Sequence, residues 1–218
     1  MPRVGLTPDQ VVDHALALID EQGAEALTLA SVAARAGVAT PSLYKHVSGG
    51  LAELRLLIAV RVTGDLADRL AEAAVGRSGD DAVAAVLRAY HAYATAHPHR
   101  YNALPQAPQP DDDLARAGAR LVGVIIAVLR EYGLEGSEAI HAARTVRSLA
   151  HGFASLTTAG GFRLAEDLAT THDRLIATLT TGLRAWPAQE AGADGHLSGA
   201  GGGAGAGAGA TARSPFTS

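Results

Sequence analysis

The chain has 218 residues, of which 48% are hydrophobic, and its formal net charge is −4 at pH 7. It contains no cysteine, which excludes disulfide bonds, thiolate metal sites and cysteine nucleophiles. The longest apolar run, 121–129, is shorter than the ~20 residues of a membrane span, and the N-terminus lacks the pattern of a signal peptide. We therefore expect a cytoplasmic protein without a membrane partner, long enough for a small domain and a larger one.

A first helix is predicted from Thr7 to Gly23, after a short arm that holds Arg3. Thr7 and Gln10 have the spacing of a capping box, and Pro8 suits the first helical turn. One face of this helix is expected to be buried, because its apolar residues recur at helical spacing. These residues are Val11, Val12, Ala15, Leu16 and Ile19.

Residues 28–47, TLASVAARAGVATPSLYKHV, predict a helix, a tight turn and a second helix. Thr28 is expected to cap the first helix, and Gly37 to end it in the left-handed conformation. The second helix is expected to begin with Thr40 as its N-cap and Pro41 in its first position.

The second of these helices is expected to have an apolar and a polar side. Leu43 and Val47 fall on the apolar side, and in a helix-turn-helix the opposite side enters the major groove of DNA. Four nearby cations, Arg35, Lys45, Arg55 and Arg61, face one anion, Glu53, which suits a nucleic-acid partner. The alternative is an αα-corner whose polar side is merely solvated. The residues expected to meet DNA are Thr28 at the first cap, and Thr40, Pro41, Ser42, Tyr44, Lys45 and His46 in the second helix.

The run LTLASVAARAGVATPSLYKHV resembles the DNA-binding domain of the tetracycline-repressor (TetR) family, and PSLYKHV is close to its recognition helix. The family usually has a lysine at the start of its fourth helix that contacts phosphate, whereas this chain has Gly49 and Gly50 there. The resemblance implies a transcriptional regulator, most simply a repressor that a small-molecule effector releases from DNA. One helix-turn-helix per chain implies a homodimer on a near-palindromic, double-stranded operator.

The remaining pattern is helical, with no period of two that would indicate strands, so the expected fold class is all-α. A long helix over 51–74 is predicted to join a helix-turn-helix domain, 1–48, to a ligand-binding and dimerisation domain, 49–186. Gly49, Gly50 and Gly64 are the predicted hinge of that helix. Further helices are predicted over 80–97, 112–132, 137–159 and 166–185. The tail 187–218 holds nine of the 25 glycines and is expected to be disordered.

Residues 76–101 and 148–162 look like the ligand-binding domain of a TetR subgroup named for a Trp-His-Gly motif, which here reads Ala150-His151-Gly152. Tyr93, Arg147 and His151 are the candidate ligand-binding residues. The alternatives are a hydrogen-bonded core histidine, a core tyrosine, and an arginine paired with a carboxylate.

The last two predicted helices are the candidates for the dimer interface. The alternative is that their apolar stripes pack inside one subunit. The stripes consist of Leu168, Leu175, Leu179, Gly182, Leu183 and Trp186 on the last helix, and of Val146, Ala150, Gly152 and Phe153 on the one before.

Nothing in the pattern requires a cofactor, a metal or an enzymatic activity. The scattered histidines form no pair at i, i+4, and Ser148, His151 and Asp173 lack the nucleophile elbow of a hydrolase. A helical small-molecule-binding protein or enzyme without DNA binding is the alternative function.

Overall fold

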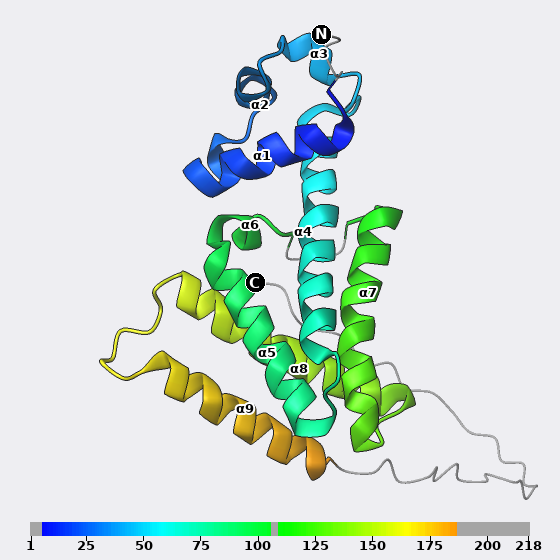
Figure 1. Ribbon diagram of the computed structural model, residues 1–218, viewed down its shortest axis with the longest axis vertical. Coiled ribbons are helices and arrows are strands. Elements are labelled where there is room, and N and C mark those ends of the chain that lie inside the picture. The colour runs from blue at the N-terminus through cyan, green and yellow to red at the C-terminus, as the bar shows by residue number, and fades with distance from the viewer. Residues whose placement is uncertain (1–5, 106–108, 187–218) are drawn as a thin grey trace, which may run out of the picture. The chain divides into compact units, whose positions relative to one another are not determined.

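All regular structure in residues 6–105 and 109–186, the part of the chain that the computed structural model describes, is helical (Figure 1). The predicted all-α class is therefore confirmed. The arm with Arg3 and the predicted tail, 187–218, lie outside the described residues, and residues up to Trp186 belong to one unit. The division into domains at residue 48 stays a prediction.

The α-helices are α1 (Pro8–Gln22), α2 (Leu29–Ala36), α3 (Thr40–Leu43), α4 (Gly50–Ala74), α5 (Gly79–Ala96), α6 (Pro98–Asn102), α7 (Asp112–Leu129), α8 (Gly136–Thr158) and α9 (Leu168–Arg184), with 3-10 turns η1 (Ala24–Ala26) and η2 (Arg130–Tyr132).

Capping boxes close the starts of α1, where one was predicted, and of α2, where only the cap at Thr28 was predicted. The Thr7 hydroxyl accepts a hydrogen bond from Gln10 N–H, and the Gln10 side chain accepts one from Thr7 N–H. Thr28 and Ser31 form the same exchange, at 3.0 Å in both directions. Each cap satisfies backbone groups that have no partner within the helix, which contributes about 1 kcal/mol.

Gly37 ends α2 in the left-handed conformation, as predicted, with φ 68° and ψ 28°. The next residue, Val38, donates its N–H to Ala33 O at 3.0 Å, so the chain turns back over the helix it has left. This closed turn sets the direction in which α3 starts.

The predicted start of α3 is wrong by one residue. Ala39 is the N-cap, while Thr40 is already helical and its hydroxyl makes no capping bond. The α-helix also stops at Leu43, because His46 N–H bonds to Leu43 O, an i+3 contact that tightens the final turn. Val47 N–H also bonds to Leu43 O at 2.9 Å, so residues 44–47 form a hydrogen-bonded turn that follows α3.

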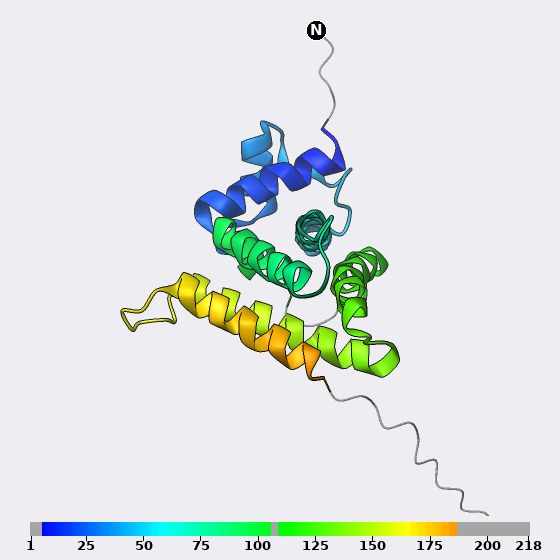
Figure 2. The same ribbon diagram turned by 60° about the horizontal axis from the view of Figure 1, so that its bottom comes forward.

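The long helix α4 begins at Gly50 and runs from α1 to a position between α5 and α7 (Figures 1 and 2). Gly50 is buried and has φ +67°, a conformation that favours glycine. Because proline fixes φ near −65°, a Gly50→Pro substitution would disrupt the start of α4. It would therefore not be a way to make the predicted hinge more rigid. The side chains that α4 buries are Leu54, Ile58, Ala59, Val62, Thr63, Leu66, Ala67 and Leu70.

The predicted helices of the C-terminal part are present within a few residues, but no helix was predicted over α6. The helix predicted over 80–97 ends just before Pro98, and Pro98 occupies the first turn of α6, where its missing N–H has no cost. Asp111 caps α7 by accepting from Leu114 N–H at 2.8 Å. Ser78 and Glu135 are the N-cap residues of α5 and α8, and Asp80 lies in the first turn of α5, where a carboxylate stabilises the helix start.

The apolar stripes of α8 and α9 mostly pack inside one chain. Val146, Ala150 and Phe153 of α8 are at most 6% exposed, and Leu179 and Leu183 of α9 are 7% and 1% exposed. These five residues are therefore unavailable to a second subunit, as the alternative interpretation held. Gly182 is exposed, while Leu168, Leu175, Gly152 and Trp186 are half-buried.

Candidate nucleic-acid interface and effector site

The outward side of α3 and its following turn is polar and accessible. Leu43 and Val47 are 0% exposed and hold the segment to the core, whereas Tyr44, between them in sequence, is 51% exposed. This division is the one the helical spacing predicted. Of the other residues expected at DNA, Pro41, Lys45 and Thr28 are exposed, and Thr40, Ser42 and His46 are half-buried.

A carboxylate lies where the family resemblance leads one to expect a phosphate-binding lysine. Gly49 N–H donates to Glu53 Oε2 at 2.6 Å, and the Ser48 hydroxyl donates to the same oxygen at 3.4 Å. Glu53 thus caps the start of α4 with a negative charge, which favours that helix end but repels a phosphate. Phosphate contacts must therefore come from elsewhere on this surface.

The basic excess counted along residues 28–61 is partly neutralised by α1. Arg35 pairs with Glu21 at 2.6 Å, and Arg61 pairs with both Asp9 and Asp13, at 2.8 and 2.9 Å. By contrast, Lys45 and Arg55 have no ion pair with any described residue. Lys45 is consequently the principal unpaired cation on the α3 surface.

In the C-terminal helices, Tyr90, Tyr101, His151 and Ser155 form a chain of polar contacts, here called the polar cluster. The Tyr90 and Tyr101 hydroxyls are 3.0 Å apart, the Tyr101 hydroxyl lies 2.5 Å from His151 Nδ1, and His151 Nε2 lies 3.4 Å from Ser155 Oγ. Burial, with a smaller effect from Arg147, lowers the pKa of His151, so the imidazole is neutral at pH 7. A neutral ring accepts at one nitrogen and donates at the other, which suits a position between two hydroxyls.

The three predicted ligand-binding residues have different hydrogen-bond partners. The Tyr93 hydroxyl donates to Val62 O of α4 at 3.4 Å, and burial raises its pKa to about 12. His151 belongs to the polar cluster, whereas Arg147 is exposed on α8. Arg147 and His151 lie one turn apart on α8, whereas Tyr93 lies on α5 and its hydroxyl reaches α4.

A second aromatic group, which sequence reasoning missed, joins α5, α8 and α9. His172 stacks on Phe153 with ring centroids 4.6 Å apart and an interplanar angle of 9°, and His91 lies 4.9 Å from His172. Burial lowers the pKa of both histidines below the ordinary value of 6.5. The buried His91 Nε2 has no hydrogen-bond partner among the described residues. Nothing in the local sequence brings these residues together, because they lie on three different helices.

The pair of His91, which is half-buried, and His172, which is buried, predicts that acid destabilises the protein. Since the folded-state pKa values of His91 and His172 are depressed, these groups stabilise the fold above about pH 6.5, and this is lost as the pH falls through the folded-state values. The free energy of unfolding in urea should therefore drop between about pH 7.5 and about pH 5.5, by at most about 1.4 kcal/mol per pH unit for each histidine. His172→Phe should flatten this slope, while His99→Gln, at an exposed position, should not; equal slopes in both variants would contradict the assignment.

The residues considered for catalysis are dispersed. Asp173 pairs with Arg88 at 3.0 Å, Ser148 is exposed, and His151 is engaged with Tyr101, so they form no catalytic set. Among residues 6–105 and 109–186, no group of three or more His, Asp or Glu residues is arranged to hold a metal ion. None of the described helices combines the length and hydropathy that crossing a bilayer requires.

Two family models match the chain. Residues 11–48 match the model of bacterial regulatory proteins of the tetR family, and residues 83–179 match the model of the tetracyclin repressor-like C-terminal domain. The first match contains α2, the Gly37 turn and α3.

Named relatives cover most of the chain. It is 38% identical over 159 residues to the uncharacterized HTH-type transcriptional regulator Rv0681 of Mycobacterium tuberculosis, covering 71% of this chain and 72% of the relative. It is 33% identical over 183 residues to the uncharacterized HTH-type transcriptional regulator YobS of Bacillus subtilis, covering 84% and 95%. A crystal structure of the putative regulatory protein SCO4313 superimposes with a TM-score of 0.66 at 28% identity, covering 79% of this chain and 94% of that one. The chain therefore belongs to the tetR family of bacterial regulatory proteins, which are DNA-binding transcriptional regulators.

Proposed function

We propose that this protein is a repressor that binds a near-palindromic operator as a homodimer and leaves it when a small molecule binds. The observation that carries the DNA-binding part is the division of the α3 segment, in which Leu43 and Val47 are fully buried while Tyr44 and Lys45 are exposed. A segment anchored in this way offers polar side chains to base edges without disturbing the core.

The proposed contacts divide into two kinds. Lys45 and the free N–H groups at the start of α2, beside Thr28, bind phosphates. Pro41, Ser42 and Tyr44 lie nearest the groove, with Thr40 and His46 on its flanks. Because Arg35 and Arg61 are paired with α1, few cations remain, and the affinity should depend only modestly on salt.

Lys45→Ala is expected to weaken binding to the DNA upstream of the protein's own gene. The loss of one phosphate contact in each half-site should reduce the slope of log K against log salt by about 0.9 per contact. Gel-shift titrations at several salt concentrations measure both effects. Arg69→Ala, which removes an exposed cation farther along α4, is the matched control and should bind like wild type. Unchanged affinity of Lys45→Ala would contradict the assignment of α3 to the groove.

We infer that the dimer forms through α8, α9 and the connection between them. Apolar side chains remain exposed there although half of the stripe residues of the two helices are buried: Leu156 is 49% exposed, Ile140 47% and Leu164 87%. The exposed side of α9 carries small residues, including Ala177, Thr181 and Gly182, which allow close approach of a second helix.

Light scattering at micromolar concentration should give the mass of a dimer. Leu156→Asp should raise the dissociation constant about tenfold or more, because burying an unpaired carboxylate costs more than about 1.4 kcal/mol. Val75→Asp, at a side chain that is 76% exposed between α4 and α5, should leave the dimer intact. A monomeric wild type would exclude this interface.

The effector is proposed to bind among α4, α5, α6 and α8, where Tyr93, His151 and the adjacent Arg147 offer polar groups within a largely apolar setting. This part is supported by the match of residues 83–179 to the tetracyclin repressor-like C-terminal domain. An inducer must bind the DNA-free dimer more tightly than the DNA-bound one, since a ligand shifts an equilibrium only by its differential affinity.

A further inference from the structure

The polar cluster has a defined hydrogen-bond direction, which follows from its buried end. Tyr90 is 6% exposed, and the Tyr101 hydroxyl, 3.0 Å away, is the only hydrogen-bond partner of its hydroxyl among the described residues. If Tyr101 donated to Tyr90, the Tyr90 proton would be buried without an acceptor, which is unfavourable. Tyr90 therefore donates to Tyr101, and Tyr101 donates to His151 Nδ1 at 2.5 Å.

This direction fixes the tautomer of His151. Burial lowers the pKa of the imidazole, and a neutral ring that accepts at Nδ1 carries its proton on Nε2. His151 therefore cannot act as a base toward Ser155, and its Nε2–H is a donor. Ser155 Oγ lies 3.4 Å from Nε2, beyond the ~3.2 Å of an ordinary N–H···O bond. Because both residues are only half-buried, a better acceptor can approach this weakly engaged donor.

Two further donors lie on the same flank of α8. Arg147 precedes His151 by one turn, and Ser155 follows it by one turn. Arg147 is exposed and has no ion pair with a described residue. After burial, its positive charge is the second cause of the low pKa of His151, which places the guanidinium near the ring. The only carboxylate within α8, Glu138, accepts a hydrogen bond from Trp186 instead. This flank therefore offers donors and positive charge to an acceptor from outside the chain.

We propose that the effector carries a carboxylate, and that Arg147, His151 Nε2–H and the Ser155 hydroxyl bind it on this flank of α8. A guanidinium matches a carboxylate with two parallel hydrogen bonds, and the long side chain of Arg147 spans the turn to His151. The imidazole N–H and the hydroxyl donate to the remaining lone pairs. All three side chains are exposed or half-buried, so the ligand can touch each of them.

Tyr90 and Tyr101 lie behind this site and do not touch the ligand, because they are 6% and 3% exposed. They are positioning residues, which act by fixing the tautomer of His151. The identification of the ligand as the effector rests on the proposed function, whereas carboxylate binding itself does not.

Long-range ¹H–¹⁵N NMR of the full-length protein, labelled in histidine, tests the tautomer without ligand or DNA. At about pH 7.5 His151 should carry its proton on Nε2, and His151→Gln identifies its signals. Tyr101→Phe removes the partner of Nδ1 and should give a mixture of tautomers. Tyr90→Phe, the matched control, should leave the tautomer unchanged, because Tyr101 can still donate to Nδ1. A wild-type protein with the proton on Nδ1 would overturn the proposal.

Isothermal titration of the free protein with benzoate and its neutral isostere benzamide tests binding. Benzoate should bind more tightly than benzamide, and Arg147→Gln should weaken benzoate binding about threefold to fivefold. Ser155→Ala should weaken it about twofold to tenfold through the loss of one hydrogen bond. The affinity for benzamide should be the same in Arg147→Gln and wild type, because the amide has no charge to pair. Arg130→Gln, which removes an exposed cation just after α7, should bind benzoate like wild type.

The proposal is overturned if benzoate does not bind at millimolar concentration, or if Arg147→Gln and Ser155→Ala both bind it as wild type does. Inorganic phosphate is titrated in parallel. Phosphate binding that both variants weaken, with no binding of benzoate, would overturn the assigned head group. Benzoate binding as expected, in a protein that does not bind its upstream DNA, would instead contradict the proposed function and leave this site in place.

Discussion

Leu43→Ala is expected to lower the free energy of unfolding by about 2–5 kcal/mol and to abolish operator binding. Leu43 is 0% exposed, and α3 has only four residues, so it depends on tertiary packing rather than on its own hydrogen bonds. Removing three side-chain carbons leaves a cavity under the DNA-reading face, and the segment from Thr40 to Val47 loses one of its two buried anchors. Urea denaturation and gel-shift titration measure the two effects.

The neighbouring residue supplies the matched control. Tyr44 is 51% exposed, so Tyr44→Ala should change the free energy of unfolding by no more than about 0.5 kcal/mol. It should nevertheless weaken operator binding, because its side chain lies on the outward face. A Leu43→Ala protein with the urea midpoint of wild type would show that α3 is held by something other than this side chain.

Arg100→Gln is expected to cost about 1–3 kcal/mol, between the values for exposed and fully buried ion pairs. Arg100 of α6 donates from Nε to both oxygens of Asp20 in α1, at 2.7 and 2.9 Å, and a third bond comes from its terminal nitrogen. The two side chains are 22% and 32% exposed, so solvent screens them only in part. The variant would leave Asp20 with a half-buried charge and no cation.

A double-mutant cycle with Asp20→Asn isolates the pair from other effects of each substitution. The exposed pair Arg116 and Asp113, within α7, is the matched control, and Arg116→Gln should cost less than about 0.5 kcal/mol. Equal losses in Arg100→Gln and Arg116→Gln, with a coupling energy near zero in the cycle, would show that solvent screens both pairs alike.

The position of Arg100 gives this pair a further role. The next residue, Tyr101, bonds to Tyr90 of α5 and His151 of α8, while Arg100 bonds to α1. The short helix α6 therefore connects the polar cluster to the DNA-binding helices through two consecutive residues. Loss of the Arg100 contact should for that reason alter operator affinity as well as stability.

The sequence by itself determined the elements whose causes lie within a few residues. The cap at Thr28, the left-handed turn at Gly37 and the apolar side formed by Leu43 and Val47 follow from residue types and spacings within a few positions. Such short-range geometry is the same in any helix, so the helix-turn-helix and its exposed face could be derived before the fold was known. The missed α6 is the exception, because Pro98 suits both the end of one helix and the start of the next.

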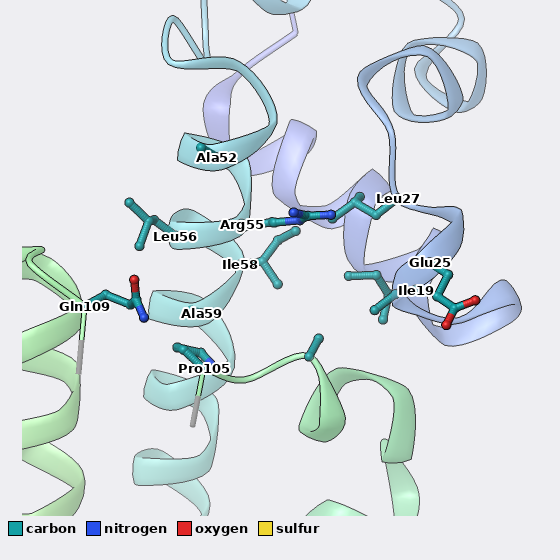
Figure 3. Close-up of a pocket in the computed structure, with 12 residues that line it drawn as sticks. Ile19, Glu25, Leu27, Ala52, Arg55, Leu56, Ile58, Ala59, Pro105 and Gln109 are labelled. Atoms are coloured by element: carbon teal, nitrogen blue, oxygen red, sulfur yellow. The ribbon is translucent and has the colours of Figure 1, made fainter. Parts of the chain in front are cut away.

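Only the tertiary structure decided which groups meet across the chain. Arg35 and Arg61 count as free cations in the sequence, yet they are paired with residues 14 to 52 positions away in α1. Arg100 and Asp20 are 80 positions apart, and Tyr101 and His151 are 50 apart. Residues of α1, η1, α4 and the segment after α6 likewise line one cavity (Figure 3). Local patterns fix which face of each helix is buried, but the partner of a side chain depends on how the helices pack, and no short-range rule contains that information.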